Sequence, residues 1–204
     1  MGKTSVTTCK LCRREGVSLC GREKCAYKRR SYPPGVHGNS KKPARLSGYG
    51  IQLREKQKAK RLYNVMERQF RRYFEAALHK KGNTASLLVQ ILEQRLDNVV
   101  YRLGFALTRR QARQMVSHGF MSVNGKKVNI PSYAVRVGDE IQIHETKRDK
   151  KLWKEREGEV AKVQPSKWLH LDTSSLKGKV VSVPEGEDLA AVFDPTLIVE
   201  LYSR

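Results

Sequence analysis

Four cysteines lie within one short basic stretch near the start of the chain, CKLCRREGVSLCGREKC, and they are its only cysteines. They are Cys9, Cys12, Cys20 and Cys25, with the spacing Cys-x2-Cys-x7-Cys-x4-Cys. A Cys-x2-Cys turn presents two thiolates to one tetrahedral ion, and a second nearby pair can complete its four ligands. The spacing therefore predicts one structural zinc ion held by four sulfur atoms.

Other chemistry remains open for these thiols. A redox-active dithiol normally lies in a thioredoxin-like strand and helix, and no such pattern surrounds the cysteines. An iron–sulfur cluster and unliganded thiols are further alternatives, whereas disulfides are not expected in a chain without a secretory signal. His37 is a candidate substitute ligand. The neighbouring cations, which favour thiolates, are Arg13, Arg14, Arg22 and Lys24.

The balance of charge points to a polyanionic partner. The 204-residue chain has 41 Lys and Arg against 20 Asp and Glu, a net charge of +21 and a pI near 10.1. Residues 1–80 alone contain 21 basic and 5 acidic residues. Each phosphate of a nucleic acid that these cations neutralise releases a condensed counterion. A solvated basic surface and a membrane-surface patch are the alternatives, but no apolar run approaches the ~20 residues that cross a bilayer.

One group of basic residues belongs to a specific pattern. Arg109 and Arg113 are four residues apart on a predicted helix that Thr108 caps, and they share one face. Such a face suits phosphate, because the helix dipole and the guanidinium groups act together, although an ordinary solvated helix face is the alternative. No aromatic platform for single bases is visible, so we expect contact with a double-stranded backbone. The module's other candidates are Arg110, Gln114, His118, Lys126 and Lys127.

The elements that must position these residues follow from periodicity, capping and turn signals. Residues 1–47 are rich in turn-forming residues and are expected to be irregular, ordered by a metal or by RNA. Asn124-Gly125 favours a type I′ hairpin turn. Helices are predicted over 48–64 (N-cap Ser47), 65–83, 84–104 (N-cap Thr84), 109–119 and 147–164, and strands over 168–172, 179–183 and 197–202.

Several motifs resemble those of one protein family. They are LCRREG (11–16), YPPGVHG (32–38), QLREKQKAKRLY (52–63), ERQFRRYF (67–74), LEQRLDNVVYRLGFALTRRQARQMVSHG (92–119), VNGKKVNIPSYAVRVGDEI (123–141) and IVELYSR (198–204). With them, nearly the whole chain resembles the bacterial small-subunit ribosomal protein S-four family. The stretch 92–141 resembles the small RNA-binding domain that is named after this family and recurs in other RNA-binding proteins.

The resemblance implies an α+β fold with three parts. Residues 1–47 would form an irregular, metal-bound, cysteine-rich N-terminal segment. Residues 48–91 would form a mostly helical domain that residues 157–204 complete. Residues 92–156 would form an inserted small RNA-binding domain made of helices and a hairpin.

The resemblance also implies a function. We expect a non-enzymatic structural constituent of the small (30S) ribosomal subunit. It would be a primary binder of 16S rRNA that nucleates assembly of the 30S body, lies near the channel by which mRNA enters, and influences translational accuracy. Its neighbours would be ribosomal proteins S-five and S-three, and its cofactor one structural zinc ion. It would be cytoplasmic, with no membrane partner and no small-molecule substrate.

The residues expected to contact rRNA are basic or hydrogen-bonding. They are Arg13, Arg14, Lys28, Arg29, Arg30, His37, Arg54, Lys56, Lys58, Arg61, Arg68, Arg71, Arg72, Arg109, Arg110, Gln111, Arg113, His118, Lys126 and Lys127. The resemblance implies that Lys41, Lys42 and Arg45 face the mRNA path. Zinc-binding members of the family have a longer loop between the cysteine pairs, and Cys20 is the ligand that the shorter loop here would displace.

Two other classes of function remain as alternatives. Pseudouridine synthases and some aminoacyl-tRNA synthetases carry the same module as an appendage, but they need an added catalytic domain. Outside 92–141 the sequence shows no phosphate-binding glycine loop and no plausible paired-carboxylate site. A redox-sensing regulator would depend on the four cysteines alone. The motifs favour the structural ribosomal protein.

Overall fold

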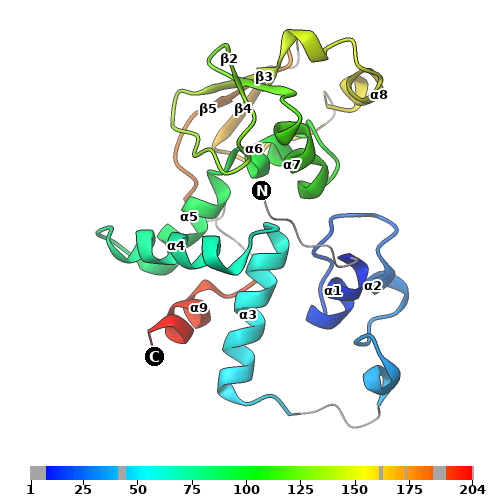
Figure 1. Ribbon diagram of the computed structural model, residues 1–204, viewed down its shortest axis with the longest axis vertical. Helices are drawn as coiled ribbons and strands as arrows, with labels where there is room; N and C mark the ends of the chain where they lie inside the picture. Colours follow the sequence, from blue (N-terminus) through cyan, green and yellow to red (C-terminus); the bar gives the residue numbers. More distant parts are fainter. Residues whose placement is uncertain (1–7, 41–44, 161–162, 173, 186–191, 204) are drawn as a thin grey trace. The chain divides into compact units, whose positions relative to one another are not determined.

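The computed structural model describes the chain except residues 1–7, 41–44, 161–162, 173, 186–191 and 204, drawn in grey in Figure 1. The chain divides into two units. The first contains the residues up to Val89 and again from Ala191 onward, and the second runs from Gln90 to Ala190. The expected mixture of helices and sheet is confirmed. Among the described residues, no helix has the length and apolarity needed to traverse a bilayer.

Short helices order the cysteine-rich start of the first unit. They are α1 (Thr8–Glu15), α2 (Ala26–Arg29) and the 3-10 helix η1 (Val36–Asn39). The prediction of an irregular segment over 1–47 is wrong for these stretches, because most of the prolines and glycines that argued against helices lie after α2. Cys9 and Cys12 are three residues apart on α1, so their thiols share one face. Cys25 is the residue directly before α2.

Three longer helices follow in the first unit: α3 (Gly48–Leu62), α4 (Glu67–Leu78) and α5 (Thr84–Glu93), whose last residues belong to the second unit. The N-cap predicted at Ser47 is confirmed, since its Oγ accepts a hydrogen bond from Gly50 N–H at 3.2 Å. The cap of α5 is Asn83 rather than Thr84. Asn83 Oδ1 accepts from Ala85 N–H at 2.9 Å, which satisfies a donor of the first turn.

The end of the described chain is a helix, α9 (Pro195–Tyr202), and not the strand predicted over 197–202. Its β-branched residues suggested a strand, but its start has strong helix signals. Asp194 Oδ1 accepts a hydrogen bond from Thr196 N–H at 2.8 Å, and Pro195 occupies the first turn, where its missing N–H costs nothing. Capping therefore outweighs β propensity at this position.

Helix α9 packs against α3 and α4 and closes the core of the first unit (Figure 1). The Tyr202 ring stacks on Phe74, with 4.6 Å between the centroids. Gln52 Nε2 donates to Glu200 Oε2 at 2.9 Å across α3 and α9. The buried apolar side chains of these three helices are Ala59, Leu62, Phe70, Phe74, Ala77 and Ile198.

The second unit contains one antiparallel sheet with the strand order β2-β1-β3-β5-β4. The strands are β1 (Met121–Val123), β2 (Lys126–Val128), β3 (Glu140–Ile143), β4 (Leu169–Asp172) and β5 (Lys177–Val180). Because β5 pairs with β3, residues 157–190 belong to this unit. The predicted domain boundary is corrected accordingly: from 157–204, only the part from 191 onward joins the first unit.

Helices α6 (Leu96–Arg102) and α7 (Arg109–Ser117) share one core with the strands, and η2 (Glu145–Lys147) and α8 (Lys151–Val160) follow the sheet's third strand. The hairpin turn is confirmed, because Asn124 and Gly125 have φ of 50° and 77°. The fully buried side chains of this core include Leu96, Val99, Val100, Leu103, Phe105, Ala112, Val116, Met121 and Ile141.

The helix predicted over 84–104 is interrupted between α5 and α6. Arg95 has extended backbone (φ −69°, ψ 137°) and forms an isolated bridge with Ala134. Leu96 N–H donates to Tyr133 O at 2.8 Å, and Val135 N–H donates to Gln94 O at 3.0 Å. Hydrogen bonds to a distant segment therefore replace the helical ones, which periodicity within 84–104 could not indicate.

The close approach of Leu103, the residue after α6, to Gly178 of β5 predicts a matched pair of effects. A Cβ at Gly178 would overlap the Leu103 side chain, and because Leu103 is fully buried, its displacement would disturb the surrounding core. We expect Gly178→Ala to destabilise the second unit by about 1–3 kcal/mol through overpacking. Gly158→Ala, in α8 with nothing within 4 Å of the new Cβ, should instead stabilise it by about 0.5–1 kcal/mol.

Urea unfolding followed by tryptophan fluorescence measures both variants, because Trp153 and Trp168 are the only tryptophans and both lie in the second unit. Equal stabilities for the two variants would contradict the close contact.

Candidate metal centre and nucleic-acid interface

The four cysteines predicted as ligands come together. The sulfur atoms of Cys9, Cys20 and Cys25 all lie within 4.8 Å of one another. The Cys12 thiol is within hydrogen-bonding contact of Cys20 and Cys25, and Cys12 and Cys25 are buried. Tetrahedral zinc with Zn–S of about 2.3 Å needs sulfurs about 3.8 Å apart, a small contraction of this cluster. The seven-residue loop therefore leaves Cys20 within reach.

The chemistry of the cluster also fits a divalent cation. Burial and the adjacent Cys20 thiol raise the pKa of Cys12 to about 12, because a thiolate there would be poorly solvated. Burial acts on Cys25 in the same direction. Hydrogen bonds from the Ser18 side chain and the Tyr27 backbone outweigh it and lower the pKa of Cys25 to about 7. A metal ion would replace the remaining protons and let all four sulfurs act as thiolates.

A buried acid connects the cysteine-bearing helix to α3. The Glu15 side chain, at the end of α1, is fully buried, and its Oε1 accepts hydrogen bonds from Arg54 at 3.2 Å and from Arg61. Both arginines were predicted to contact RNA. In the structure both pair with Glu15, since a buried carboxylate needs partners for its charge.

The lysines predicted on α3 are paired as well. Lys56 and Lys60 both donate to Glu67 at the start of α4, and Lys58 donates to Glu55. Burial raises the pKa of Glu67, but hydrogen bonds from the two lysines and the Tyr202 hydroxyl outweigh it and bring the pKa to about 2. The basic residues of α3 therefore join α1, α3, α4 and α9 together rather than forming an unpaired basic face.

Arg13 also has a role inside the fold. Its Nε and Nη2 donate to the carbonyls of Tyr32 and Pro33, at 2.9 and 3.1 Å, and its guanidinium lies 4.6 Å from the centre of the Tyr32 ring. It thereby fastens the turn after α2 to α1. The remaining candidates of this segment are exposed: Arg14, Lys28, Arg29, Arg30 and His37. Arg45 is exposed too, while Lys41 and Lys42 lie outside the described residues.

Helix α4 presents a basic surface opposite its apolar face. Arg68 and Arg72 are exposed and four residues apart, so they share one side of the helix. Arg71 is exposed and pairs with Glu75 at 3.2 Å. Phe70 and Phe74 point into the core. The amphipathic pattern therefore keeps arginines at the surface of the first unit.

In the second unit, α7 and the hairpin expose part of the predicted set: Arg110, His118, Lys126 and Lys127. Thr108 caps α7, with its Oγ1 accepting from Gln111 N–H at 3.2 Å, as predicted. Gln111 contributes to the same cap, because its Oε1 accepts from Leu107 N–H at 2.9 Å. Arg113 is 8% exposed, so its predicted place on an exposed face with Arg109 is wrong.

Arg113 is buried because an acid from α6 draws it inward. Asp97 Oδ2 lies 2.7 Å from Arg95 Nη2 and 3.4 Å from Arg113 Nη1, and Asp97 Oδ1 accepts from Arg95 Nε at 3.0 Å. All three side chains are less than a tenth exposed. Burial raises the pKa of Asp97 even though two guanidinium groups oppose this. The three residues form one buried ion cluster at the start of α6.

A second network of hydrogen bonds and ring contacts orients the Arg109 side chain. Glu93 Oε2 accepts from Asn98 Nδ2 at 2.7 Å, and Asn98 Oδ1 accepts from Arg109 Nε at 2.8 Å. The Arg109 guanidinium lies 4.4 Å from the centre of the Tyr101 ring. Arg102 completes the set with two hydrogen bonds to Glu93, at 3.0 and 2.9 Å. Arg109 is therefore half-buried and held in one orientation.

Sequence reasoning missed these positioning residues. Glu15, Glu93, Asp97 and Asn98 are polar but buried. A signal was present, because Glu93, Asp97 and Asn98 lie among the apolar residues of LLVQILEQRLDNVV, where buried polar groups require partners. The partners themselves could not be read from periodicity.

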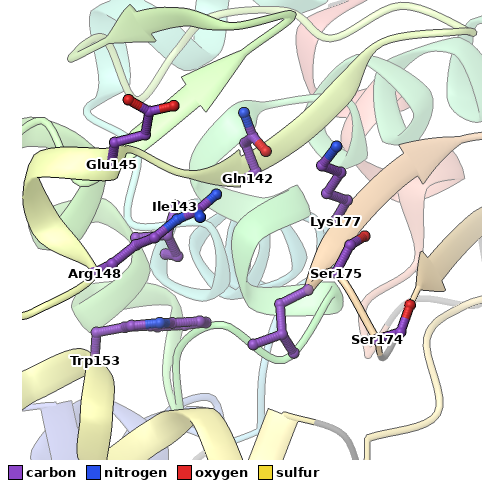
Figure 2. A pocket seen from close by; sticks show the side chains of 9 residues that line it. Gln142, Ile143, Glu145, Arg148, Trp153, Ser174, Ser175 and Lys177 are labelled. Atoms are coloured by element: carbon purple, nitrogen blue, oxygen red, sulfur yellow. The ribbon is translucent and has the colours of Figure 1, made fainter.

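The second unit has a hollow of about 490 Å³ that the sequence did not indicate. Figure 2 shows the side chains that line it. Arg148 and Lys177 face it, but so does Glu145, and the nearby Asp172 carboxylate accepts hydrogen bonds from the Ser174 and Ser175 hydroxyls. Positive and negative groups are nearly balanced here. The hollow therefore does not favour a polyanion.

Comparisons with known proteins agree with the two-part chain. Residues 3–93 match the family model described as "Ribosomal protein S4/S9 N-terminal domain", and residues 94–141 match the "S4 domain". The chain is 52% identical over 211 residues to the small ribosomal subunit protein uS4 of Acetivibrio thermocellus. It is 50% identical over 210 residues to that of Thermus thermophilus and 49% to that of Thermodesulfovibrio yellowstonii, with both chains fully covered in every case.

The buried ion cluster predicts a strong dependence of the second unit on one carboxylate. Asp97→Asn removes the buried carboxylate charge that the guanidinium groups of Arg95 and Arg113 share, so we expect a loss of about 3–5 kcal/mol in unfolding free energy. Arg71→Gln breaks an exposed pair of α4 and should cost less than about 0.5 kcal/mol. Tryptophan fluorescence in urea reports the first variant, and circular dichroism reports both. A small effect of Asp97→Asn would show that the cluster is not required.

Proposed function

The chain belongs to the uS4 family of small-subunit ribosomal proteins, and we propose that it is a primary 16S rRNA-binding protein that nucleates assembly of the 30S body. The observation that carries the proposal is the family match over the full length of the chain. The S4 domain within it is consistent with binding to rRNA.

As a member of this family, the chain is a structural constituent of the small subunit and not an enzyme, as expected from its sequence. The alternative of an RNA-modifying enzyme requires a catalytic domain beside the RNA-binding module. The residues before that module match a ribosomal protein domain instead. A small-subunit protein acts where ribosomes are, in the cytoplasm.

The mechanism is neutralisation of phosphates by exposed cations of both units. Exposed arginines and lysines release counterions when they meet an RNA backbone, and several contacts made together pin RNA helices in one arrangement. Arg109, which is held by Asn98 and Tyr101, supplies an oriented guanidinium. The exposed arginine and lysine candidates are Arg14, Lys28, Arg29, Arg30, Arg68, Arg71, Arg72, Arg110, Lys126 and Lys127.

The proposal includes the surroundings expected within the subunit. Ribosomal proteins S-five and S-three would be neighbours, and Arg45, with Lys41 and Lys42, would face mRNA near the channel by which it enters. A position there would let the protein influence translational accuracy. Family resemblance supports this part of the proposal, together with the exposure of Arg45.

We also propose that Cys9, Cys12, Cys20 and Cys25 bind one structural zinc ion. The mutual proximity of the Cys9, Cys20 and Cys25 sulfurs and the contacts of the Cys12 thiol with Cys20 and Cys25 support this assignment. Three of the four residues, Cys12, Cys20 and Cys25, are buried. The ion would cross-link the segment from α1 to α2. This segment needs such a cross-link because it has little apolar surface of its own to bury.

The rRNA assignment predicts specific, salt-dependent binding. The full chain should bind a 5′-domain fragment of 16S rRNA far more tightly than an unrelated RNA of equal length. The affinity should fall steeply between 50 and 200 mM salt, because counterion release drives it. The slope of log K against log salt is negative. The double variant Lys126→Gln/Lys127→Gln should reduce the magnitude of this slope by about one for each lost phosphate contact.

A control is Lys154→Gln, which removes one exposed lysine of α8 that pairs with Asp149 at 3.6 Å and is outside the proposed surface. Its slope should equal that of the unmodified chain. Equal binding of both RNAs by the unmodified chain would overturn the function. An effect of Lys154→Gln as large as that of the hairpin variant would remove the hairpin from the interface.

The zinc assignment predicts one ion per chain in protein purified without added metal, measured by mass spectrometry. The four thiols should then resist thiol reagents, and Cys20→Ser should lose the ion. Four freely reactive thiols in metal-free purified protein would show that the cluster does not hold zinc.

A further inference from the structure

A basic hollow of about 340 Å³ lies in the first unit, within the cysteine-rich segment. Its lining residues are Arg13 on α1, Ala26 and Arg29 on α2, and Arg30. None of the described residues that line it is acidic. Three of the four lining residues are arginines, whose like charges repel one another, so an anion bound at the hollow would relieve that repulsion.

One side of this hollow is built before any ligand binds. The Arg13 guanidinium is fixed by two backbone carbonyls and by the Tyr32 ring. These partners orient the side chain without neutralising its charge, because none of them is a carboxylate. A group that is ordered in advance loses little conformational entropy on binding.

The rest of the lining lies next to the thiol cluster in sequence. Ala26 follows Cys25 directly, just as Arg13 follows Cys12. Lys28 N–H donates to Cys25 O at 3.0 Å, and Arg30 N–H donates to Ala26 O at 2.9 Å, so the turn of α2 starts at the cysteine. The two sides of the hollow are thus each one residue away from a sulfur of the cluster.

We propose that this hollow binds one phosphate group of an RNA backbone and that the thiol cluster holds its two sides at the required separation. The inference rests on the proposed function, since rRNA is the ligand. The guanidinium fork matches phosphate oxygens. The surrounding charge favours RNA over a small free anion: residues 1–47 contain 12 basic and 2 acidic residues, so the segment as a whole attracts a polyanion.

The main experiment compares two variants that remove the same charge from the same segment. Arg29→Gln/Arg30→Gln changes the hollow, and Arg22→Gln/Lys24→Gln changes exposed residues outside it. The binding of the full chain to the 5′-domain fragment is measured as a function of salt. Arg29→Gln/Arg30→Gln should reduce the magnitude of the slope of log K against log salt by about one, and Arg22→Gln/Lys24→Gln should leave it unchanged. Equal slopes for the two variants would overturn the phosphate site.

A probe independent of rRNA separates this inference from the proposed function. Inorganic phosphate, titrated into the full chain, should shift the NMR signal of Arg13 Nε–H, and Arg29→Gln/Arg30→Gln should abolish the shift. If phosphate shifts the signal but rRNA binds unspecifically, the proposed function fails and the anion site stands. If rRNA binds specifically and phosphate shifts nothing, the hollow is not a phosphate site.

The role of the cluster is tested in a Cys25→Ser background. If the thiols hold the hollow in shape, Cys25→Ser alone should reduce the magnitude of the slope of log K against log salt by about one. Adding Arg29→Gln/Arg30→Gln should then cause no further change, because both lesions remove the same contact. Fully additive effects would show that the hollow forms without the cluster.

Discussion

The fold of this chain has to accommodate an excess of positive charge. It does so with acidic side chains that each pair with two basic ones. Glu15 accepts from Arg54 and Arg61, Glu67 from Lys56 and Lys60, and Asp97 from Arg95 and Arg113. Each of these acids joins segments that are separated in sequence. Because 41 basic residues face 20 acidic ones, a one-to-one pairing is impossible. Shared acids place a few cations inside and leave the rest for a polyanion.

The separation of the cations into buried, paired residues and exposed residues explains which predictions from sequence succeeded. Local signals were reliable: Ser47 and Thr108 cap their helices, and Asn124-Gly125 turns the hairpin, because each of these effects involves only a few adjacent residues. The burial of Arg113 could not be predicted in this way, since its partner lies sixteen residues earlier in another helix. The break at Arg95 has the same origin, a hydrogen-bonded partner near Ala134.

The candidate site was predicted unevenly for the same reason. The four cysteines could be assigned to one cluster because their spacing alone brings them together. The basic residues could be listed by type and position on a helix. Their separation into oriented, paired and exposed groups required Glu93, Asn98 and Tyr101, whose relation to Arg109 exists only in the folded unit. Charge composition identifies the class of partner, and tertiary contacts decide which side chains remain available to it.

The packing of α9 on α3 and α4 has a consequence for the order of events during synthesis. Residues 90–190 are made after α3 and α4 but before α9, so the ribosome completes the whole second unit in the interval. Until Tyr202 and Ile198 emerge, the aromatic surface of Phe70 and Phe74 lacks its cover. The first unit is therefore begun first but can complete its core only at the end of translation. While residues 90–190 are being translated, the apolar faces of its helices stay uncovered.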